Sequence, residues 1–116
     1  MTETDCLFCK FVSGELQTDV VLETDSVLAF RDINPQAPTH ILIIPRQHIA
    51  TVNDLTESDA GLIGDLYLIA KELAKEEGFS EDGYRLVMNC NAAAGQTVFH
   101  MHLHLLGGRV FDWPPG

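Results

Sequence analysis

Val98-Phe99-His100-Met101-His102-Leu103-His104-Leu105-Leu106 is the stretch from which the fold and the chemistry of this chain are best predicted. Histidine occupies every second position from residue 100 to residue 104, and the residues between the histidines are apolar. Because successive side chains of a β-strand point to opposite faces, this period of two predicts a strand over residues 98–106. Its three imidazoles would then lie on one face and its apolar side chains would lie on the other.

Three neighbouring imidazoles indicate a functional role, since they repel one another when they are protonated. The alternative is an exposed polar face, but Lys, Glu and Thr are the usual residues on such a face. Metal binding and phosphorus chemistry are the two uses that suit imidazole. Either use predicts that this strand borders a site.

Phosphorus chemistry agrees with the segment that precedes the histidines. Gly95-Gln96-Thr97 supplies a flexible turn, backbone N–H donors and a hydroxyl, all suited to a developing phosphoryl charge. Neutral imidazole is a nucleophile near pH 7, and its phosphoramidate intermediate is labile. His102 has a histidine two residues away on each side, so it is the best placed of the three to attack.

The remaining pattern predicts an α+β domain with a largely antiparallel sheet. Apolar residues at helical spacing predict a short helix over Cys6–Ser13 and a long helix from Thr56 to near Gly78. Short runs rich in Val, Ile and Leu predict strands at 20–23, 27–31, 41–44 and 84–89, besides 98–106. With 116 residues and no repeats, we expect one domain over residues 1–116.

The charge balance limits the class of partner. The formal net charge is -10, from 17 acidic and 7 basic residues, so we expect no nucleic-acid partner. A single small phosphorylated ligand is compatible with this charge, because backbone amides and a few imidazoles can bind one phosphate. Met1–Asp5 is polar and no apolar run reaches the length of a membrane span, so we expect no membrane partner. Three cysteines, an odd number, favour a reducing compartment and therefore a cytoplasmic location.

Several segments together make the chain similar to the histidine triad (HIT) superfamily, whose signature alternates histidine with hydrophobic residues as residues 100–106 do. The segments that resemble its Hint branch are Asp32–His40, Ile44–His48, Gly95–Val98, Gly107–Arg109 and Trp113–Gly116. The ending that contains tryptophan distinguishes this branch from the Fhit-like dinucleoside polyphosphate hydrolases.

The resemblance implies the HIT fold, a five-stranded antiparallel sheet with two helices, which pairs with a second copy into a homodimer with a continuous ten-stranded sheet. It implies a purine nucleoside phosphoramidase, which hydrolyses purine nucleoside 5′-monophosphate derivatives, such as adenosine 5′-phosphoramidate, through a nucleotidyl-histidine intermediate. No cofactor is required for this chemistry. The long helix and the C-terminal segment are the expected dimer contacts, with Trp113 near the partner's active site.

The resemblance also assigns roles to residues of the site. His102 would be the nucleophile, while His104 and His40 would position the phosphate and His100 would shape the site from the same strand. Thr97 stands where the branch commonly has serine, and its hydroxyl would hydrogen-bond the leaving group.

The nucleoside would lie against Asp32, which matches the acidic residue that holds the ribose hydroxyls. Arg31 takes a position that often carries histidine. The implied base pocket is Leu7, Phe8, Phe11, Phe30 and Ile33, and the further nucleotide contacts are Asn89, Gly95, Gln96, Thr97, Val98, His102 and His104. The alternatives are core packing for the apolar residues and a turn role for Asp32 before Asn34-Pro35.

A metal site is a separate expectation. Cys6-Leu7-Phe8-Cys9 is a C-x2-C pair, and some relatives in the superfamily join such a pair to two histidines to bind structural zinc. His48 and His100 occupy the matching positions. The alternative is that both thiols are packed or exposed on the first helix, and Cys90 is expected to be a buried small residue.

Two rival functions use the same site. The chain could be a dinucleoside polyphosphate hydrolase that attacks through the same histidine, or a nucleotide-binding regulatory protein whose activity is vestigial. Relative turnover of adenosine phosphoramidates and diadenosine polyphosphates separates these functions.

Overall fold

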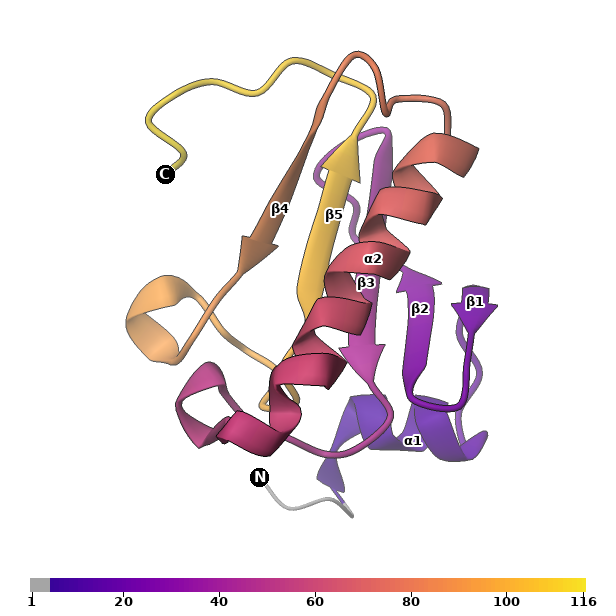
Figure 1. The fold of residues 1–116 in the computed structure, drawn as a ribbon, viewed down its shortest axis with the longest axis vertical. Helices are drawn as coiled ribbons and strands as arrows, with labels where there is room; N and C mark the ends of the chain where they lie inside the picture. Colours follow the sequence, from indigo (N-terminus) through magenta and orange to yellow (C-terminus); the bar gives the residue numbers. More distant parts are fainter. Residues whose placement is uncertain (1–4) are drawn as a thin grey trace.

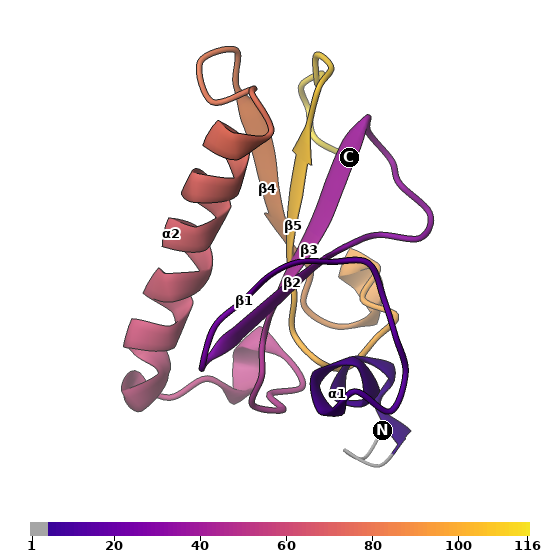
Figure 2. The same cartoon turned by 90° about the vertical axis from the view of Figure 1, so that its right-hand side faces the viewer.

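The computed structural model describes residues 5–116 and shows an antiparallel sheet with one long helix across one face and a short helix beside the other (Figures 1 and 2). Most of the predicted polar segment Met1–Asp5 therefore lies outside the described residues. The elements in chain order are α1 (Leu7–Ser13), β1 (Val20–Glu23), β2 (Val27–Arg31), β3 (Thr39–Pro45), α2 (Ala60–Glu76), β4 (Tyr84–Met88) and β5 (Leu103–Gly107).

The sheet has the strand order β1-β2-β3-β5-β4, and every neighbouring pair is antiparallel. This confirms the predicted α+β class, with five strands and two helices. The apolar run Ile41–Ile44 lies in the central strand β3 and is buried along its whole length, as its composition predicted. Among the described residues, no helix is long and apolar enough to cross a membrane.

The main core lies between the sheet and α2. Leu103 and Leu105 of β5 are fully buried there, and they pack in one cluster with Leu66, Ala70 and Leu73 of the helix. The helix begins after a 3-10 turn in which the Asp59 carboxylate accepts from the backbone N–H of Thr56, as the Thr-x-x-Asp spacing predicted. One face of the sheet is thus closed by the helix, and His40 and His104 lie on the other face.

On that other face, α1 covers the end of the sheet at which the chain enters β5 (Figure 2). Phe8 of this helix packs in a second buried cluster with Leu28 and Phe30 of β2 and Leu42 of β3. Gly14 ends α1 in the left-handed conformation, with φ of 83°, which glycine adopts without strain.

The predicted strand over 98–106 is wrong in its first half, because β5 begins only at Leu103. The last pairs of its ladders join Leu103 to Ile43 and to Met88, and residues before Leu103 leave the sheet. Their backbone is held elsewhere: the N–H of Met101 donates to the carbonyl of Ile49, at 2.8 Å. His100 and His102 therefore precede the strand, and strand alternation does not fix where their side chains point.

Gly107 at the end of β5 is predicted to tolerate no side chain. A Cβ built there would lie 2.5 to 2.6 Å from three ring carbons of Phe79, a residue of the main core. Gly107→Ala should lower the free energy of unfolding by about 1–3 kcal/mol, the usual cost of overpacking a core. Urea unfolding measures this loss.

The matched control is Gly64→Ala in α2, where a Cβ would meet no atom within 4 Å. That change should raise stability by about 0.5–1 kcal/mol, since alanine is the better helix former. Equal stability of the two variants would contradict the predicted clash.

Candidate active site

Two central strands bring three histidines together. His40 lies on β3 and His104 on β5, where the register sets His40 opposite Leu106 and Leu42 opposite His104. The two histidines are thus diagonal neighbours on one face, and Nε2 of His40 lies 2.9 Å from Nδ1 of His104. His102 comes just before β5, and its ring centroid is 4.9 Å from that of His104.

A chain of hydrogen bonds fixes where the protons of the neutral rings lie. The backbone N–H of Gln36 donates to Nδ1 of His40 at 3.0 Å, so the proton of His40 is on Nε2. That Nε2–H donates to Nδ1 of His104, and a carboxylate oxygen of Asp32 lies 3.5 Å from the same Nε2. His104 must then carry its own proton on Nε2, which leaves this atom as a donor.

His102 has the opposite tautomer. Its Nδ1 lies 2.8 Å from the carbonyl oxygen of His100, and an oxygen can only accept, so Nδ1 carries the proton. The other ring nitrogen, Nε2, keeps its lone pair. The site thus pairs a nucleophilic nitrogen on His102 with an N–H donor on His104.

Burial keeps these rings neutral. It lowers the pKa of His40 and of His102, and in both cases the nearby Asp32 carboxylate offsets only part of the effect. It lowers the pKa of His104 to about 4, with a further decrease from positive charge on His102 or His40. Near pH 7 the lone pair of His102 is therefore available without loss of a proton.

His102 and His104 line a pocket of about 660 Å³. Most of the residues predicted to hold a nucleotide line this pocket: Leu7, Phe8, Phe11, Phe30, Arg31, Asp32, Ile33, Thr97 and Val98. Gln17, Thr18, Asp19 and Leu42 also line it. No pattern in the sequence indicated the first three, whereas Leu42 could have been found because it lies two residues from His40 on the same face of a strand.

Three predicted nucleotide contacts do not line the pocket, namely Asn89, Gly95 and Gln96. The Gln96 side chain is buried and fully engaged within the loop. Its oxygen accepts from the N–H of Asn91 at 2.7 Å, and its Nε2 donates to the carbonyls of Ala50 and Val98. This amide holds the loop that carries Thr97, so the predicted nucleotide contact of Gln96 can come only from its backbone.

Arg31 lies at the pocket, but its charge is already paired. Its guanidinium donates to both carboxylate oxygens of Glu77, at 2.8 and 3.3 Å, and a carboxylate oxygen of Asp19 lies 4.0 Å from its Nε. The Glu77 hydrogen bonds are the largest cause of the raised pKa of Arg31. The pocket thus has a polar rim of opposite charges beside an apolar interior.

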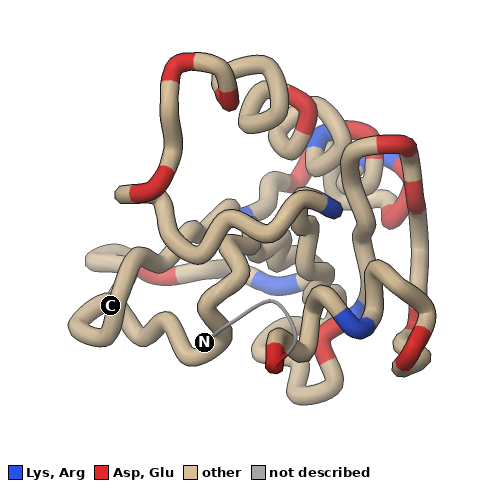
Figure 3. The backbone as a smooth tube through the Cα atoms, turned by 90° about the horizontal axis from the view of Figure 1, so that it is seen from below, with Lys and Arg blue, Asp and Glu red and all other residues tan. Residues whose placement is uncertain are grey.

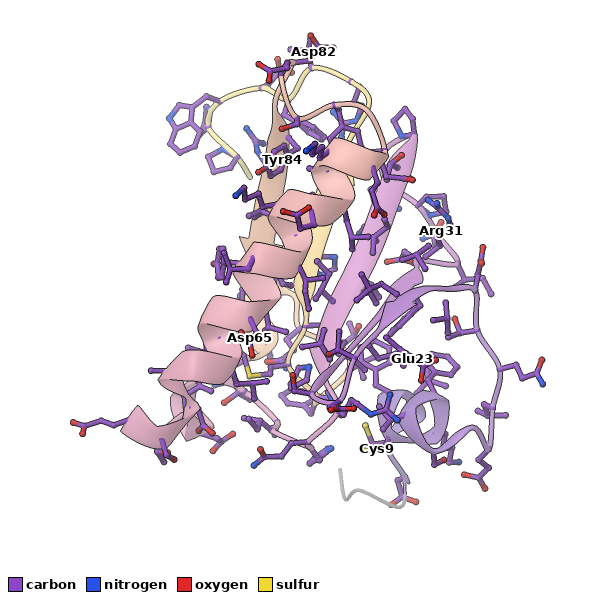
Figure 4. The ribbon with its side chains drawn as sticks, turned by 45° about the vertical axis from the view of Figure 1, so that its right-hand side comes forward. Cys9, Glu23, Arg31, Asp65, Asp82 and Tyr84 are labelled. Atoms are coloured by element: carbon purple, nitrogen blue, oxygen red, sulfur yellow. The ribbon has the colours of Figure 1, made fainter. Side chains whose placement is uncertain are left out.

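His100 belongs to a second cluster, with Cys6, Cys9 and His48, whose ligand atoms all lie within 4.8 Å of one another. Nδ1 of His100 is 3.5 Å from each of the two sulfurs, and Nδ1 of His48 is 3.2 Å from the Cys9 sulfur. Cys9 is labelled on α1 in Figure 4. The prediction that all three imidazoles share one face is therefore wrong for His100, because residues 98–102 are not a strand.

The donor set of this cluster fits a zinc ion. Nε2–H of His100 donates to the carbonyl of Pro45 at 2.7 Å, which leaves the Nδ1 lone pair directed at the thiols. A carbonyl on the outer nitrogen is the usual support of a metal-ligating histidine. Burial lowers the pKa of His100 to about 4, so the ring is neutral, as a ligand must be. Two thiols and two imidazoles complete a tetrahedral set.

Comparison with known proteins agrees with this geometry. A sequence model of the HIT domain matches residues 13–111. The chain belongs to the HIT domain family. This HIT protein is 51% identical over 112 residues to an uncharacterized HIT-like protein from Synechococcus elongatus, with 97% of each chain covered.

Two further relatives are informative. A purine nucleoside phosphoramidase from Escherichia coli K12 is 50% identical over 105 residues, which cover 90% of this chain and 88% of the relative. The crystal structure of a HIT family hydrolase from Legionella pneumophila is 58% identical with a TM-score of 0.95, and the match covers 97% of this chain and all of that one. The resemblance inferred from the motifs is thus confirmed for family and fold.

The buried histidines predict a loss of stability in acid. His40 and His104 have lowered pKa values in the folded chain, whereas unfolding returns them to about 6.5. Below that pH the unfolded state binds more protons, so the free energy of unfolding should fall as the pH drops from about 6.5 toward 4. Each such histidine contributes a slope of up to about 1.4 kcal/mol per pH unit. Urea unfolding at pH 6.5, 6.0, 5.5 and 5.0 measures it.

The matched variant is His104→Asn, which removes one of these groups. Its stability should depend on pH less steeply over the same range, by up to about the slope of one histidine. An unchanged slope would contradict the neutral state assigned to His104.

Proposed function

We propose that this HIT protein hydrolyses purine nucleoside 5′-monophosphate derivatives, phosphoramidates in particular, through a nucleotidyl intermediate on His102. The observation that carries the proposal is the pairing of a lone pair on His102 Nε2 with an N–H on His104 Nε2 in one pocket. The Escherichia coli relative called purine nucleoside phosphoramidase supports the choice of substrate.

In the first step, Nε2 of His102 attacks the phosphorus of the substrate. A P–N bond forms to the histidine while the P–N bond to the leaving amine breaks. The amine departs with a proton, for which the Thr97 hydroxyl at the pocket wall is the proposed donor. The His102 ring gains positive charge, and its Nδ1–H bond to the His100 carbonyl strengthens accordingly.

In the second step, water attacks the same phosphorus and the bond to His102 breaks, while one proton of the water passes to Thr97 and restores its hydroxyl. The nucleoside monophosphate leaves, and the ring regains its lone pair. The Nε2–H of His104 is proposed to hydrogen-bond the phosphoryl oxygens in both steps, where their negative charge develops. His40 supports this donor, because its Nε2–H occupies the other nitrogen of His104.

The nucleoside is proposed to occupy the rest of the pocket. Phe8, Phe11 and Phe30 pack edge to face or stacked on one another, and they offer apolar surface for a purine. Asp32 also lines the pocket, with a carboxylate oxygen 3.5 Å from Nε2 of His40, and its carboxylate is proposed to accept from ribose hydroxyls. Base and phosphate would thus be held in different parts of one pocket.

His102→Ala should abolish turnover of adenosine 5′-phosphoramidate, because no other nitrogen can form the intermediate. His104→Asn should slow turnover by about 10²- to 10⁴-fold, the usual contribution of a positioned proton donor or polar group. Acid quench with a labelled phosphoramidate, followed by peptide mapping, should place the label on His102.

Four outcomes would count against this mechanism or its substrate. Label on another residue, or full activity of His102→Ala, would remove the covalent role of His102. Faster turnover of diadenosine polyphosphates than of phosphoramidates would favour the polyphosphate hydrolase, and tight AMP binding without turnover of either would favour the regulatory protein.

We further propose a homodimer, supported by the open edge of the sheet. β4 is an edge strand in the described chain, and the C-terminal segment beside it exposes Val110 and Trp113, the latter at 82% of its surface (Figure 1). An unpaired edge next to exposed apolar side chains suits pairing with a second copy.

Sedimentation should therefore give the mass of two chains. Deletion of residues 113–116 should alter the ranking of phosphoramidates with different leaving groups while the protein stays folded. A monomer, or an unchanged ranking, would contradict the proposed dimer or the proposed role of its C-terminus.

Structural zinc on Cys6, Cys9, His48 and His100 is a second proposal, which the fit of the donor set supports. When bound, the ion would cross-link α1 to two distant loops, and four protein ligands leave no position for a reactive water. Reduced thiols here agree with the cytoplasmic location that we also propose.

Purified protein should then contain about one zinc per chain, and Cys9→Ser should contain far less. Cys90→Ser is the matched control, since Cys90 is only partly buried, contrary to its prediction, and lies outside the cluster. Atomic emission spectroscopy gives the metal content, and a metal-free wild-type protein would remove the proposal.

A further inference from the structure

His100 takes part in two neighbouring clusters, the thiols and imidazoles of Cys6, Cys9 and His48 and the active-site histidines. Its ring lies against the two thiols and donates from Nε2 to Pro45, while its backbone carbonyl accepts the Nδ1–H of His102. That hydrogen bond is what leaves the lone pair of His102 on Nε2. The ring and the carbonyl are parts of one residue, so the orientation of the His100 ring and the direction of its carbonyl are coupled.

Helix α1 also borders two sites, the cluster of thiols and imidazoles and the pocket. Cys6 and Cys9 point into the four-ligand cluster, while Leu7, Phe8 and Phe11 of the same two turns line the nucleotide pocket. The Phe8 ring packs edge-on against His102, with centroids 5.1 Å apart and an interplanar angle of 85°. One short helix thus places a wall of the pocket and a contact of the nucleophile.

Apart from the packing of Phe8 and Phe11 on Phe30, few contacts hold this helix in place. It spans seven residues, a length at which an isolated helix is not stable in water, and it makes no sheet pairing. Besides its buried Phe8, a hydrogen bond from Arg46 to the carbonyl of Val12, at 3.3 Å, joins it to the loop after β3. The cluster of thiols and imidazoles is therefore a polar anchor of α1, in addition to its apolar packing.

We propose that the cluster of Cys6, Cys9, His48 and His100 is a positioning device for the reaction, so that its occupancy by Zn²⁺ sets nucleotide affinity and turnover together. The part of this inference that concerns turnover rests on the proposed function. A cation that ties both thiols to His100 fixes α1 against residues 100–102, and hence fixes Phe8 and the His100 carbonyl relative to His102. Its four ligands act through these contacts and touch no substrate.

The size of the effect follows from the accuracy that attack requires. A displacement of about 1 Å at a reacting atom can reduce a rate about 100-fold. Loss of supporting contacts around a site typically costs about 10- to 100-fold in activity or affinity. We therefore expect the metal-free protein to bind AMP about 10-fold more weakly and to have a kcat about 10- to 100-fold lower.

The experiment compares four proteins: zinc-loaded wild type, chelator-treated wild type, His48→Gln and Cys90→Ser. His48 lies on neither α1 nor residues 100–102, and its side chain meets them within the cluster, with Nδ1 3.2 Å from the Cys9 sulfur and its ring centroid 5.1 Å from that of His100. Calorimetry gives the Kd for AMP, turnover of adenosine 5′-phosphoramidate gives kcat, and proton NMR follows the Nδ1–H of His102. All are measured well below the melting temperature of each protein.

We expect the metal-free wild type and His48→Gln to share a raised Kd, a lowered kcat and a weakened or exchange-broadened Nδ1–H signal. Added Zn²⁺ should restore the wild type but not His48→Gln, and Cys90→Ser should match the zinc-loaded wild type throughout. If the metal is purely structural, its removal would lower the melting temperature and leave Kd, kcat and the NMR signal unchanged, which would overturn the inference.

Failure of the proposed function looks different. If zinc-loaded wild type turns over no phosphoramidate, the proposed function fails, whereas the Kd for AMP and the Nδ1–H signal still report positioning. If it is active and all three readings are insensitive to Zn²⁺ and to His48→Gln, only the positioning inference fails.

Discussion

The hydrogen bond between His40 and His104 exists only because β3 and β5 are antiparallel neighbours at the centre of the sheet. Their register sets the two residues diagonally on one face, while Leu103 and Leu105, on the other face, are buried against α2. A slip of one residue would turn His104 into the core and a leucine into the site. The packing of α2 therefore selects the register that assembles the histidines.

Burial of the histidine rings determines the chemistry of the site. Rings removed from water resist protonation, so His102 and His104 can divide their roles by tautomer near pH 7. The division comes from fixed backbone groups, the N–H of Gln36 at one end and the carbonyl of His100 at the other. Neither backbone group can change its role as donor or acceptor, which makes the tautomers a property of the fold.

Local spacing in the sequence predicted the helices and strands, and the resemblance to the HIT superfamily implied most of the residues that line the pocket. Strand alternation located His104, and the helical spacing of Leu7, Phe8 and Phe11 placed them together, as observed. The prediction of a strand failed at residues 98–102. His100 and His102 alternate there because each serves a different site, and the segment is not a strand. His100 alternates with His102 in sequence, but the carbonyl of Pro45 and the thiols of α1 draw its ring elsewhere.

Long-range pairing explains what local spacing did not reveal. Arg31 is joined to Glu77, 46 residues away at the end of α2, and no sequence pattern links the two. Of the described residues that line the pocket, Arg31 alone has a permanent positive charge, and Glu77 and Asp19 balance it.

The anionic phosphate of the proposed substrate would therefore be held without a free cation, in a chain whose net charge is -10 and whose acidic residues are spread around its outline (Figure 3). Neutral N–H donors can do this, since they attract the phosphate oxygens without themselves needing a counter-charge. The Nε2–H of His104 is such a donor, and its strength depends on the His40 bond behind it. This N–H attracts the phosphoryl oxygens weakly in the ground state and more strongly as negative charge develops on them. Such a difference favours turnover over tight binding of the product.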